Sequence, residues 1–196
     1  MSGPAVPRLL SRFCLLPLLL AAFLLSACAT RSPHVPPPSA AEVMELAAAL
    51  RSLGPDVDPE EAARMARISY DYPRELAVAW NVTDSAYIHN VKVNNGTRPR
   101  GLCYQWADDL EARLLQEDFR TIDLHRAIAN AMTPLRIEHS TVIASAAGAR
   151  MDQGIVLDPW RNGGDLYWGP VLEDTRYPWV EREKVFAAKR ALAEGR

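Results

Sequence analysis

The spacing of the apolar residues changes once along this chain, and that change limits the folds open to it. Up to residue 115 apolar positions recur three or four residues apart, as at Trp106, Leu110 and Leu114. From residue 119 onward they come in short runs rich in β-branched residues, separated by turn sequences such as Arg-Asn-Gly-Gly-Asp at 161–165. Helices followed by a series of short strands indicate an α+β domain with an antiparallel sheet.

Proline and glycine residues divide the chain into expected elements. Asp58 is a suitable N-cap for a helix whose first residue is Pro59. In the first half we expect helices over 41–53, from 59 to a kink or end at Tyr72-Pro73, and over 75–80, and a short extended piece over 91–93. In the second half we expect a helix that has Cys103 in its first turn and includes Leu110 and Leu114. Strands are expected over 119–128, 136–146, 154–160 (stopped by Pro159) and 166–168, and a last helix over 180–193.

The first 28 residues have the pattern of an export signal. Arg8 and Arg12 precede an apolar run over 13–25, which is too short to span a bilayer comfortably. The run ends in Leu25-Ser26-Ala27-Cys28, which resembles the lipobox of bacterial lipoproteins, in which the cysteine is acylated after cleavage just before it. An ordinary secretory signal cut near Ala27 is the alternative.

The lipobox resemblance implies a domain organisation and a location. Residues 1–27 would be the signal peptide, and 28–40 a lipid-bearing Cys28 followed by a proline-rich tether. The remaining 41–196 would be one α+β domain. Stable attachment to a membrane would come from more than one acyl chain on Cys28. Alanine rather than aspartate at position 29 implies, within that family, the bacterial cell envelope at the periplasmic face of the outer membrane.

Composition narrows the possible functions. A formal net charge of −2 without a basic cluster argues against nucleic acid as a partner. We find no zinc-ligand spacing, phosphate loop or dinucleotide fingerprint, so no metal or other cofactor is expected. If Cys14 leaves with the signal and Cys28 carries lipid, Cys103 is the one remaining thiol. An unpaired thiol in an oxidising compartment is either reactive or well buried.

Three residues of the second half have the order of a nucleophile, a base and an orienting acid. Cys103 should lie in the first turn of its helix, where free N–H groups and the helix dipole favour a thiolate. His139 and Asp158 fall on successive strands, which can present them side by side. The imidazole can then take the thiol proton while the carboxylate orients the ring. His125 is the alternative base, but no Asp-Pro pair follows it at short range.

The sequence around these residues resembles the transglutaminase-like superfamily. Residues 101–107 (Gly-Leu-Cys-Tyr-Gln-Trp-Ala) resemble its G-x-C-x-x-aromatic-A segment, Leu157-Asp158-Pro159 resembles its third motif, and Glu138-His139 lies between them. The resemblance covers roughly 90–172 and implies a papain-like core that hydrolyses or transfers amides through a thioester. It makes Cys103 the nucleophile, His139 the general base and acid, and Asp158 the orienting acid. The chain also resembles uncharacterised proteobacterial lipoproteins with the same Cys-Tyr-Gln-Trp and Asp-Pro-Trp pieces.

The rest of the active site is less sharply indicated. An oxyanion hole needs the Cys103 N–H and one upstream donor, for which Asn94, Asn95 and the Trp80 indole are candidates. Gln105 should point away from the thiol. Where the family often has an aromatic pair after the histidine, this chain has Ser140-Thr141. The residues that could form the wall of a substrate cleft are Trp106, Trp160, Tyr167 and Trp168, although packing at the far end of the sheet is the favoured interpretation of Trp160 and Trp168.

These observations predict a lipid-anchored envelope cysteine enzyme that acts on amide bonds. Peptidoglycan peptides and envelope proteins are the expected substrates, on the ground of location. Two alternatives remain: a non-catalytic binding module of the same fold, and a structural lipoprotein in which Cys103 is buried.

Overall fold

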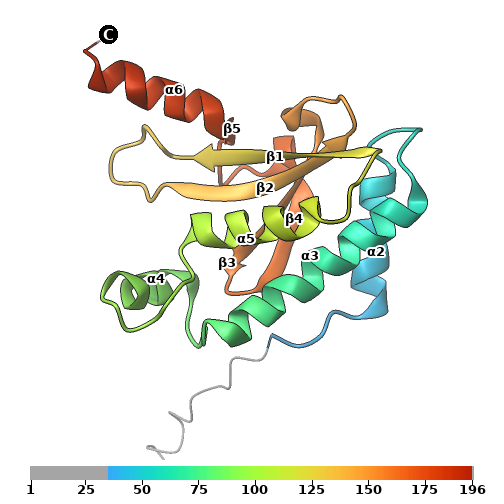
Figure 1. Ribbon diagram of the computed structural model, residues 1–196, viewed down its shortest axis with the longest axis horizontal. Helices are drawn as coiled ribbons and strands as arrows, with labels where there is room; N and C mark the ends of the chain where they lie inside the picture. Colours follow the sequence, from blue (N-terminus) through green and yellow to red (C-terminus); the bar gives the residue numbers. More distant parts are fainter. Residues whose placement is uncertain (1–34, 196) are drawn as a thin grey trace, which may run out of the picture. The chain divides into compact units, whose positions relative to one another are not determined.

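A computed structural model describes residues 35–195, which form helices packed on a five-stranded antiparallel sheet (Figure 1). The predicted signal peptide, the lipidation site Cys28 and most of the tether lie outside the described residues. No helix within 35–195 is both long and apolar enough to cross a membrane. The α+β class with an antiparallel sheet is confirmed.

The elements follow one another in the expected order, helices first. The helices are α2 (Ala40–Arg51), α3 (Pro59–Ala79), α4 (Ala86–Asn94), α5 (Cys103–Leu115) and α6 (Arg182–Ala193). The strands are β1 (Ile122–Ala129), β2 (His139–Ala146), β3 (Ile155–Asn162), β4 (Asp165–Pro170) and β5 (Val180–Glu181). They lie in the order β4-β3-β2-β1-β5, with short 3-10 turns at Met151–Gln153 and Val171–Glu173.

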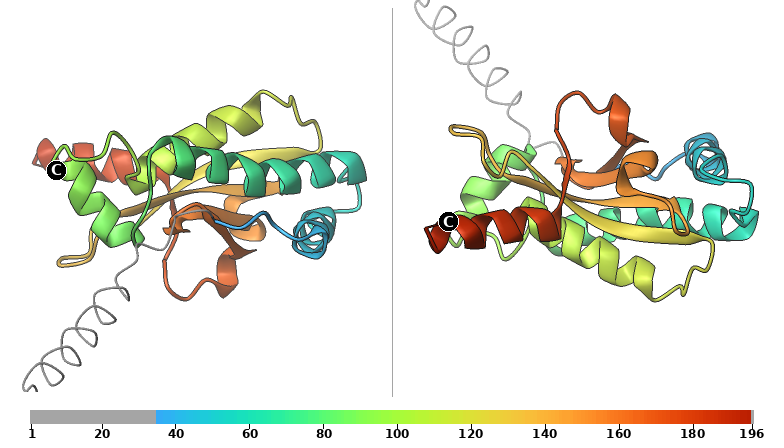
Figure 2. Two further views of the ribbon diagram at one scale, coloured as in Figure 1. Left: turned by 90° about the horizontal axis from the view of Figure 1, so that it is seen from below. Right: turned by 90° about the horizontal axis from the view of Figure 1, so that it is seen from above.

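The apolar core lies between the sheet and the helices α2, α3 and α5. Side chains alternate along β2 and β3, so that Val142 and Leu157 face this core while Ile143 and Val156 face the other side of the sheet. Figure 2 shows α3 and α5 side by side over one face of the sheet. Leu110, two turns into α5, is fully buried there. Because α5 is fixed by this packing, its first residue has a defined position relative to the ends of β2 and β3.

Three element predictions were wrong. Helix α3 runs without a break through Pro73, because Pro73, Leu76 and Ala77 continue its buried stripe. Residues 91–93 belong to helix α4, in which the buried Ala86 and His89, three residues apart, face inward. Strand β3 continues past Pro159 to Asn162, since an irregularity in its pairing with β4 accommodates a residue that cannot donate a hydrogen bond.

Candidate functional site

The turn before α5 holds Cys103 at the first position of the helix. Gly101 has a φ of +129°, and a β-carbon there would lie 2.4 Å from the buried His89 ring, so only glycine fits. The Gln105 carboxamide oxygen accepts from the N–H groups of Gly101 (2.8 Å) and Leu102 (3.0 Å). Gln105 therefore braces the turn, as expected of a side chain directed away from the thiol. Cys103 itself is half-buried.

His139 and Asp158 form a buried pair beside this helix start. His139 Nε2 lies 2.6 Å from Asp158 Oδ2, and each side chain is 1% exposed. Since a carboxylate only accepts, Nε2 carries the proton and donates, which leaves Nδ1 as the basic nitrogen of the neutral ring. Nδ1 is buried and has no hydrogen-bond partner among the described residues. The Cys103 thiol lies 3.5 Å from the carbonyl oxygen of Glu138, the residue before His139.

The environment of His139 favours its charged form. Burial lowers the pKa of the imidazole, but the charge and hydrogen bond of Asp158, together with the interaction with Cys103, outweigh burial and raise the pKa to about 9. A proton that His139 takes from the Cys103 thiol is therefore held strongly by the imidazole, which favours a thiolate–imidazolium pair.

A buried ionic network holds Asp158 in place. Arg161 Nε donates to Asp158 Oδ2 (2.9 Å), and the other end of the guanidinium donates to Asp174 (2.7 Å). Trp179 Nε1 also donates to the Asp174 carboxylate (2.9 Å). Burial raises the pKa of Asp174, but the hydrogen bonds from Arg161 and Trp179 outweigh it and hold that pKa below its usual range. Arg161 thus gives Asp158 a positively charged partner besides His139.

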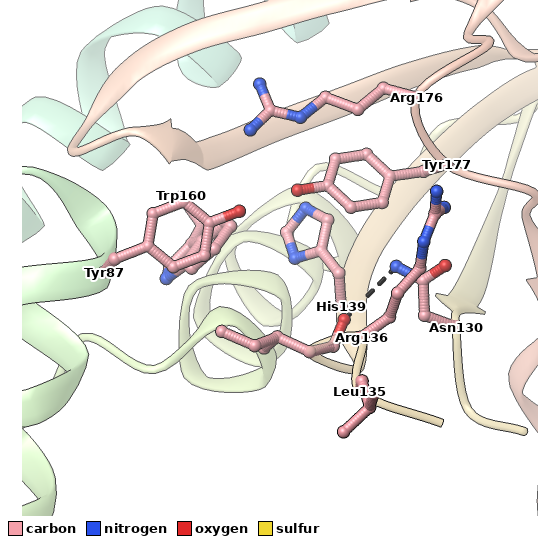
Figure 3. Close-up of a pocket in the computed structure, with 9 residues that line it drawn as sticks. Tyr87, Asn130, Leu135, Arg136, His139, Trp160, Arg176 and Tyr177 are labelled. Carbon is pink, nitrogen blue, oxygen red and sulfur yellow. Dashed lines mark hydrogen bonds between the residues drawn. The ribbon is translucent and has the colours of Figure 1, made fainter. Parts of the chain in front are cut away.

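Aromatic rings enclose the His139 imidazole on several sides. Its centroid lies 4.5 Å from those of Trp160 and Tyr177 and 5.3 Å from that of Trp179. Figure 3 shows the ring between Trp160 and Tyr177, which come from β3 and from the segment before β5. These rings keep water from the His139–Asp158 hydrogen bond, which strengthens it.

Two cavities lie at this site, one beside each member of the Cys103–His139 pair. The larger, about 630 Å³, is lined by Cys103 and by the apolar Leu102, Ile128 and Phe186, among others. The smaller, about 390 Å³, is lined by His139 and is shown in Figure 3. Ile137, in the loop between β1 and β2, lines both of them.

The three residues of the expected triad lie close together in the structure, and the alternative base His125 lies elsewhere on the sheet. His125 lies in the middle of β1 opposite Ile143, whereas His139 is opposite Ala129 at the end of the β1–β2 pair. The His125 ring is 2.8 Å from the Ser145 hydroxyl and lines neither cavity. Within residues 35–195, His139 is thus the histidine placed beside Cys103.

The oxyanion candidates are only partly placed at the site. Asn94 lines the Cys103 cavity, whereas Asn95 caps the C-terminus of α4 and lines neither cavity. Trp80 is buried edge-to-face against Trp106, with ring centroids 4.5 Å apart. The residue that sequence analysis missed is Asn90, which lines the Cys103 cavity one helical turn before Asn94. The helical spacing of the two asparagines was the available signal, and the expectation of an extended piece over 91–93 concealed it.

Of the four residues predicted to form the wall of a substrate cleft, one lines a cavity of the site. Trp160 lines the His139 cavity although it is only 2% exposed, and its Nε1 donates to the Asn90 carboxamide oxygen (3.0 Å). Trp106, Tyr167 and Trp168 line neither cavity. Trp106 is buried and donates to the Gly101 carbonyl (3.0 Å). Trp168 donates to the Tyr70 hydroxyl (2.9 Å). Tyr167 lies beneath the Arg161 guanidinium. These three side chains pack and brace the fold.

Comparison of the chain with protein-family models, with curated proteins and with solved structures finds no match. Residues 35–195 contain no group of three or more histidine, cysteine, aspartate or glutamate side chains arranged to hold a metal ion. Any function must therefore be argued from the geometry of the site.

Proposed function

We propose that this protein is a cysteine enzyme that cleaves or transfers acyl groups from amides, with a papain-like arrangement of Cys103, His139 and Asp158. The observation that supports this most is the tautomer of His139. Its Nε2–H is bound to buried Asp158, so its unpartnered Nδ1 is the nitrogen available to the Cys103 proton.

The proposed reaction has two steps. The Cys103 thiol proton passes to His139, and the thiolate attacks the amide carbonyl carbon. The C–N bond then breaks, and the leaving amine takes the proton from the imidazolium, which leaves a thioester on Cys103. In the second step His139 takes a proton from water, the oxygen attacks the thioester, and the C–S bond breaks to release the acid. An amine in place of water gives acyl transfer.

Asn90 is the side chain best suited to donate to the developing oxyanion. Its carboxamide oxygen already accepts from the Trp160 indole, which can only donate, so the amide N–H group remains available in the cavity that Cys103 lines. The N–H of Cys103, at the first position of α5, is the second donor, since the first N–H groups of a helix have no partner within it. Two such donors would stabilise the tetrahedral intermediate.

The lipobox resemblance places this chemistry in the bacterial envelope. A lipid on Cys28 would hold the domain at a membrane, and peptides of the envelope, those of peptidoglycan included, would be the accessible amides.

The experiment that tests the proposal is the pH dependence of iodoacetamide alkylation. It is read by mass spectrometry on the peptide that contains Cys103, because the full chain also contains Cys14 and Cys28. We expect labelling of Cys103 well below pH 8, slowed at least about tenfold by His139→Ala. His125→Ala, which removes a histidine outside the site, is the matched control and should leave the rate unchanged. Labelling that follows an ordinary thiol in the unchanged protein would reject the enzyme and favour a binding or structural role.

A further inference from the structure

The two cavities differ in which part of a substrate they can hold. In an acyl transfer at cysteine, the imidazolium gives its proton to the leaving amine, so the leaving group lies on the histidine side of the scissile bond. The cavity lined by His139 therefore faces the leaving group, and the cavity lined by Cys103 faces the acyl group.

The His139 cavity is lined by positively charged side chains. Two arginines, Arg136 from the β1–β2 loop and Arg176 from the segment before β5, line it, and no carboxylate does. Neither arginine forms an ion pair with a carboxylate within the part of the chain that the structure describes. The interaction with Tyr87 is the main influence on Arg176 and raises the pKa of its guanidinium. Figure 3 shows the Arg176 and Arg136 guanidinium groups on opposite sides of the Tyr177 ring.

Two further groups fit a small peptide-like anion. Burial, followed by hydrogen bonding to Tyr87, raises the pKa of Tyr177 to about 12, so its hydroxyl is neutral and does not repel an anion. Asn130 donates its amide N–H to the Ile137 carbonyl (3.2 Å), which fixes its carboxamide oxygen as an acceptor. That oxygen is buried and without a partner among the described residues. The cavity thus offers two unpaired cations beside one unpaired acceptor.

We propose that the His139 cavity binds a short leaving segment, one or two residues long, that ends in a free α-carboxylate. The carboxylate pairs with Arg136 and Arg176, and a peptide N–H donates to the Asn130 oxygen. The aromatic wall of Tyr87, Trp160 and Tyr177 limits the length of the segment. The inference rests on the proposed function and gives it a substrate class: amides near the carboxyl end of a peptide, cleaved as in a carboxypeptidase, or remade with an amino acid or dipeptide as acceptor.

The acceptor side of the reaction tests the cavity directly, because an amine that attacks the thioester occupies the place of the leaving amine. The full chain is acetylated at Cys103 with p-nitrophenyl acetate and then offered glycylglycine or glycylglycinamide, which differ in their terminal group. Formation of the two N-acetyl products is followed by mass spectrometry. We expect glycylglycine to be acetylated about tenfold faster, since only it carries a carboxylate for a charge-assisted hydrogen bond.

Two double variants separate the local effect from that of net charge. Arg136→Gln with Arg176→Gln should bring the ratio of the two rates to about one. Arg67→Gln with Arg190→Gln removes the same charge from exposed positions on α3 and α6, and should leave the ratio unchanged. A ratio near one in the unchanged protein, or one that the Arg136/Arg176 variant does not alter, would overturn the inference while the acyl-enzyme still supports the proposed function.

A binding measurement keeps the two proposals distinguishable if no acyl-enzyme forms. Tryptophan fluorescence of the full chain, titrated with N-acetylglycine or N-acetylglycinamide, reports on Trp160 in the cavity wall. Preference for the carboxylate, lost in the Arg136/Arg176 variant, would support the anion site even if Cys103 proved unreactive. Equal binding of the two compounds would reject it.

Discussion

Two regions of this domain are equally buried and are stabilised by different means. The first is the apolar core under α2, α3 and α5, where Leu110 and Leu157 are 0% exposed. The second is the ionic cluster of His139, Asp158, Arg161 and Asp174 at the end of β2 and β3, where Asp158 is likewise 0% exposed. Apolar contacts tolerate exchange for side chains of similar volume, whereas a buried charge tolerates no loss of its partner.

Helix α5 joins the two regions, and strand alternation separates them. The helix begins with Cys103 at the ionic cluster and continues into the core with Leu110 and Leu114. On β3, Leu157 faces the core and the next residue, Asp158, faces His139. Packing of α5 in the core thus fixes the position of Cys103 relative to the ionic cluster. Substitutions in the two regions should separate stability from reactivity.

The largest effect on stability is expected from Arg161→Gln. This change leaves the buried carboxylates of Asp158 and Asp174 without their shared counter-charge, and should lower the free energy of unfolding by about 4 kcal/mol. Urea denaturation measures it. Arg150→Gln is the matched control, because the Arg150–Asp152 pair is exposed and its loss should leave the stability nearly unchanged. Equal effects of the two variants would mean that the ionic cluster is not structurally required.

Leu110→Ala should destabilise the core by about 3 kcal/mol, through lost apolar contact and the cavity left behind. Below the unfolding transition, alkylation of Cys103 should keep its rate, because the site contacts are unchanged. Leu115, 60% exposed on the same helix, offers the control Leu115→Ala with little change in stability. A large fall in Cys103 reactivity in Leu110→Ala would show that the two regions are not separable.

Stability should also fall with rising pH. The pKa of His139 is raised from 6.5 to about 9 in the folded chain, so the folded state holds an additional proton between these values. The contribution is complete below the unfolded pKa of 6.5, and about 2 kcal/mol of it should be lost between pH 6.5 and about pH 8.5. Urea denaturation at several pH values measures this loss. The His139→Gln variant should lack this fall, and an equal fall in both proteins would assign the pH dependence to other groups.

The smallest effect, about 1 kcal/mol, is expected from Asp58→Ala at the start of α3. The Asp58 carboxylate accepts from the N–H groups of Glu60 (2.8 Å) and Glu61 (2.9 Å), far along the helix from the ionic cluster. Asp58→Asn, which retains a capping oxygen, should recover most of the loss, as thermal unfolding can show. If the asparagine variant were as unstable as the alanine variant, the cap would not be the cause.

The local patterns predicted most elements because their physical causes are local. The cap at Asp58-Pro59, the apolar spacing of α5 and the turn at 161–165 each depend on residues close in the chain. The predictions failed where packing decided between local alternatives. Pro73 stays within a helix because its neighbours are buried, and 91–93 are helical because Ala86 and His89 face inward.

The sequence by itself determined the fold class, the three residues of the proposed triad and their order along the chain. Only the tertiary structure decided that His139 rather than His125 lies beside Cys103, because strand pairing sets where along β1–β2 each histidine lies. It also decided that Arg161 neutralises Asp158 and Asp174, and that Asn90 and the two cavities belong to the site. These contacts join residues from different helices, strands and loops, and no periodicity along the chain encodes their distance in space.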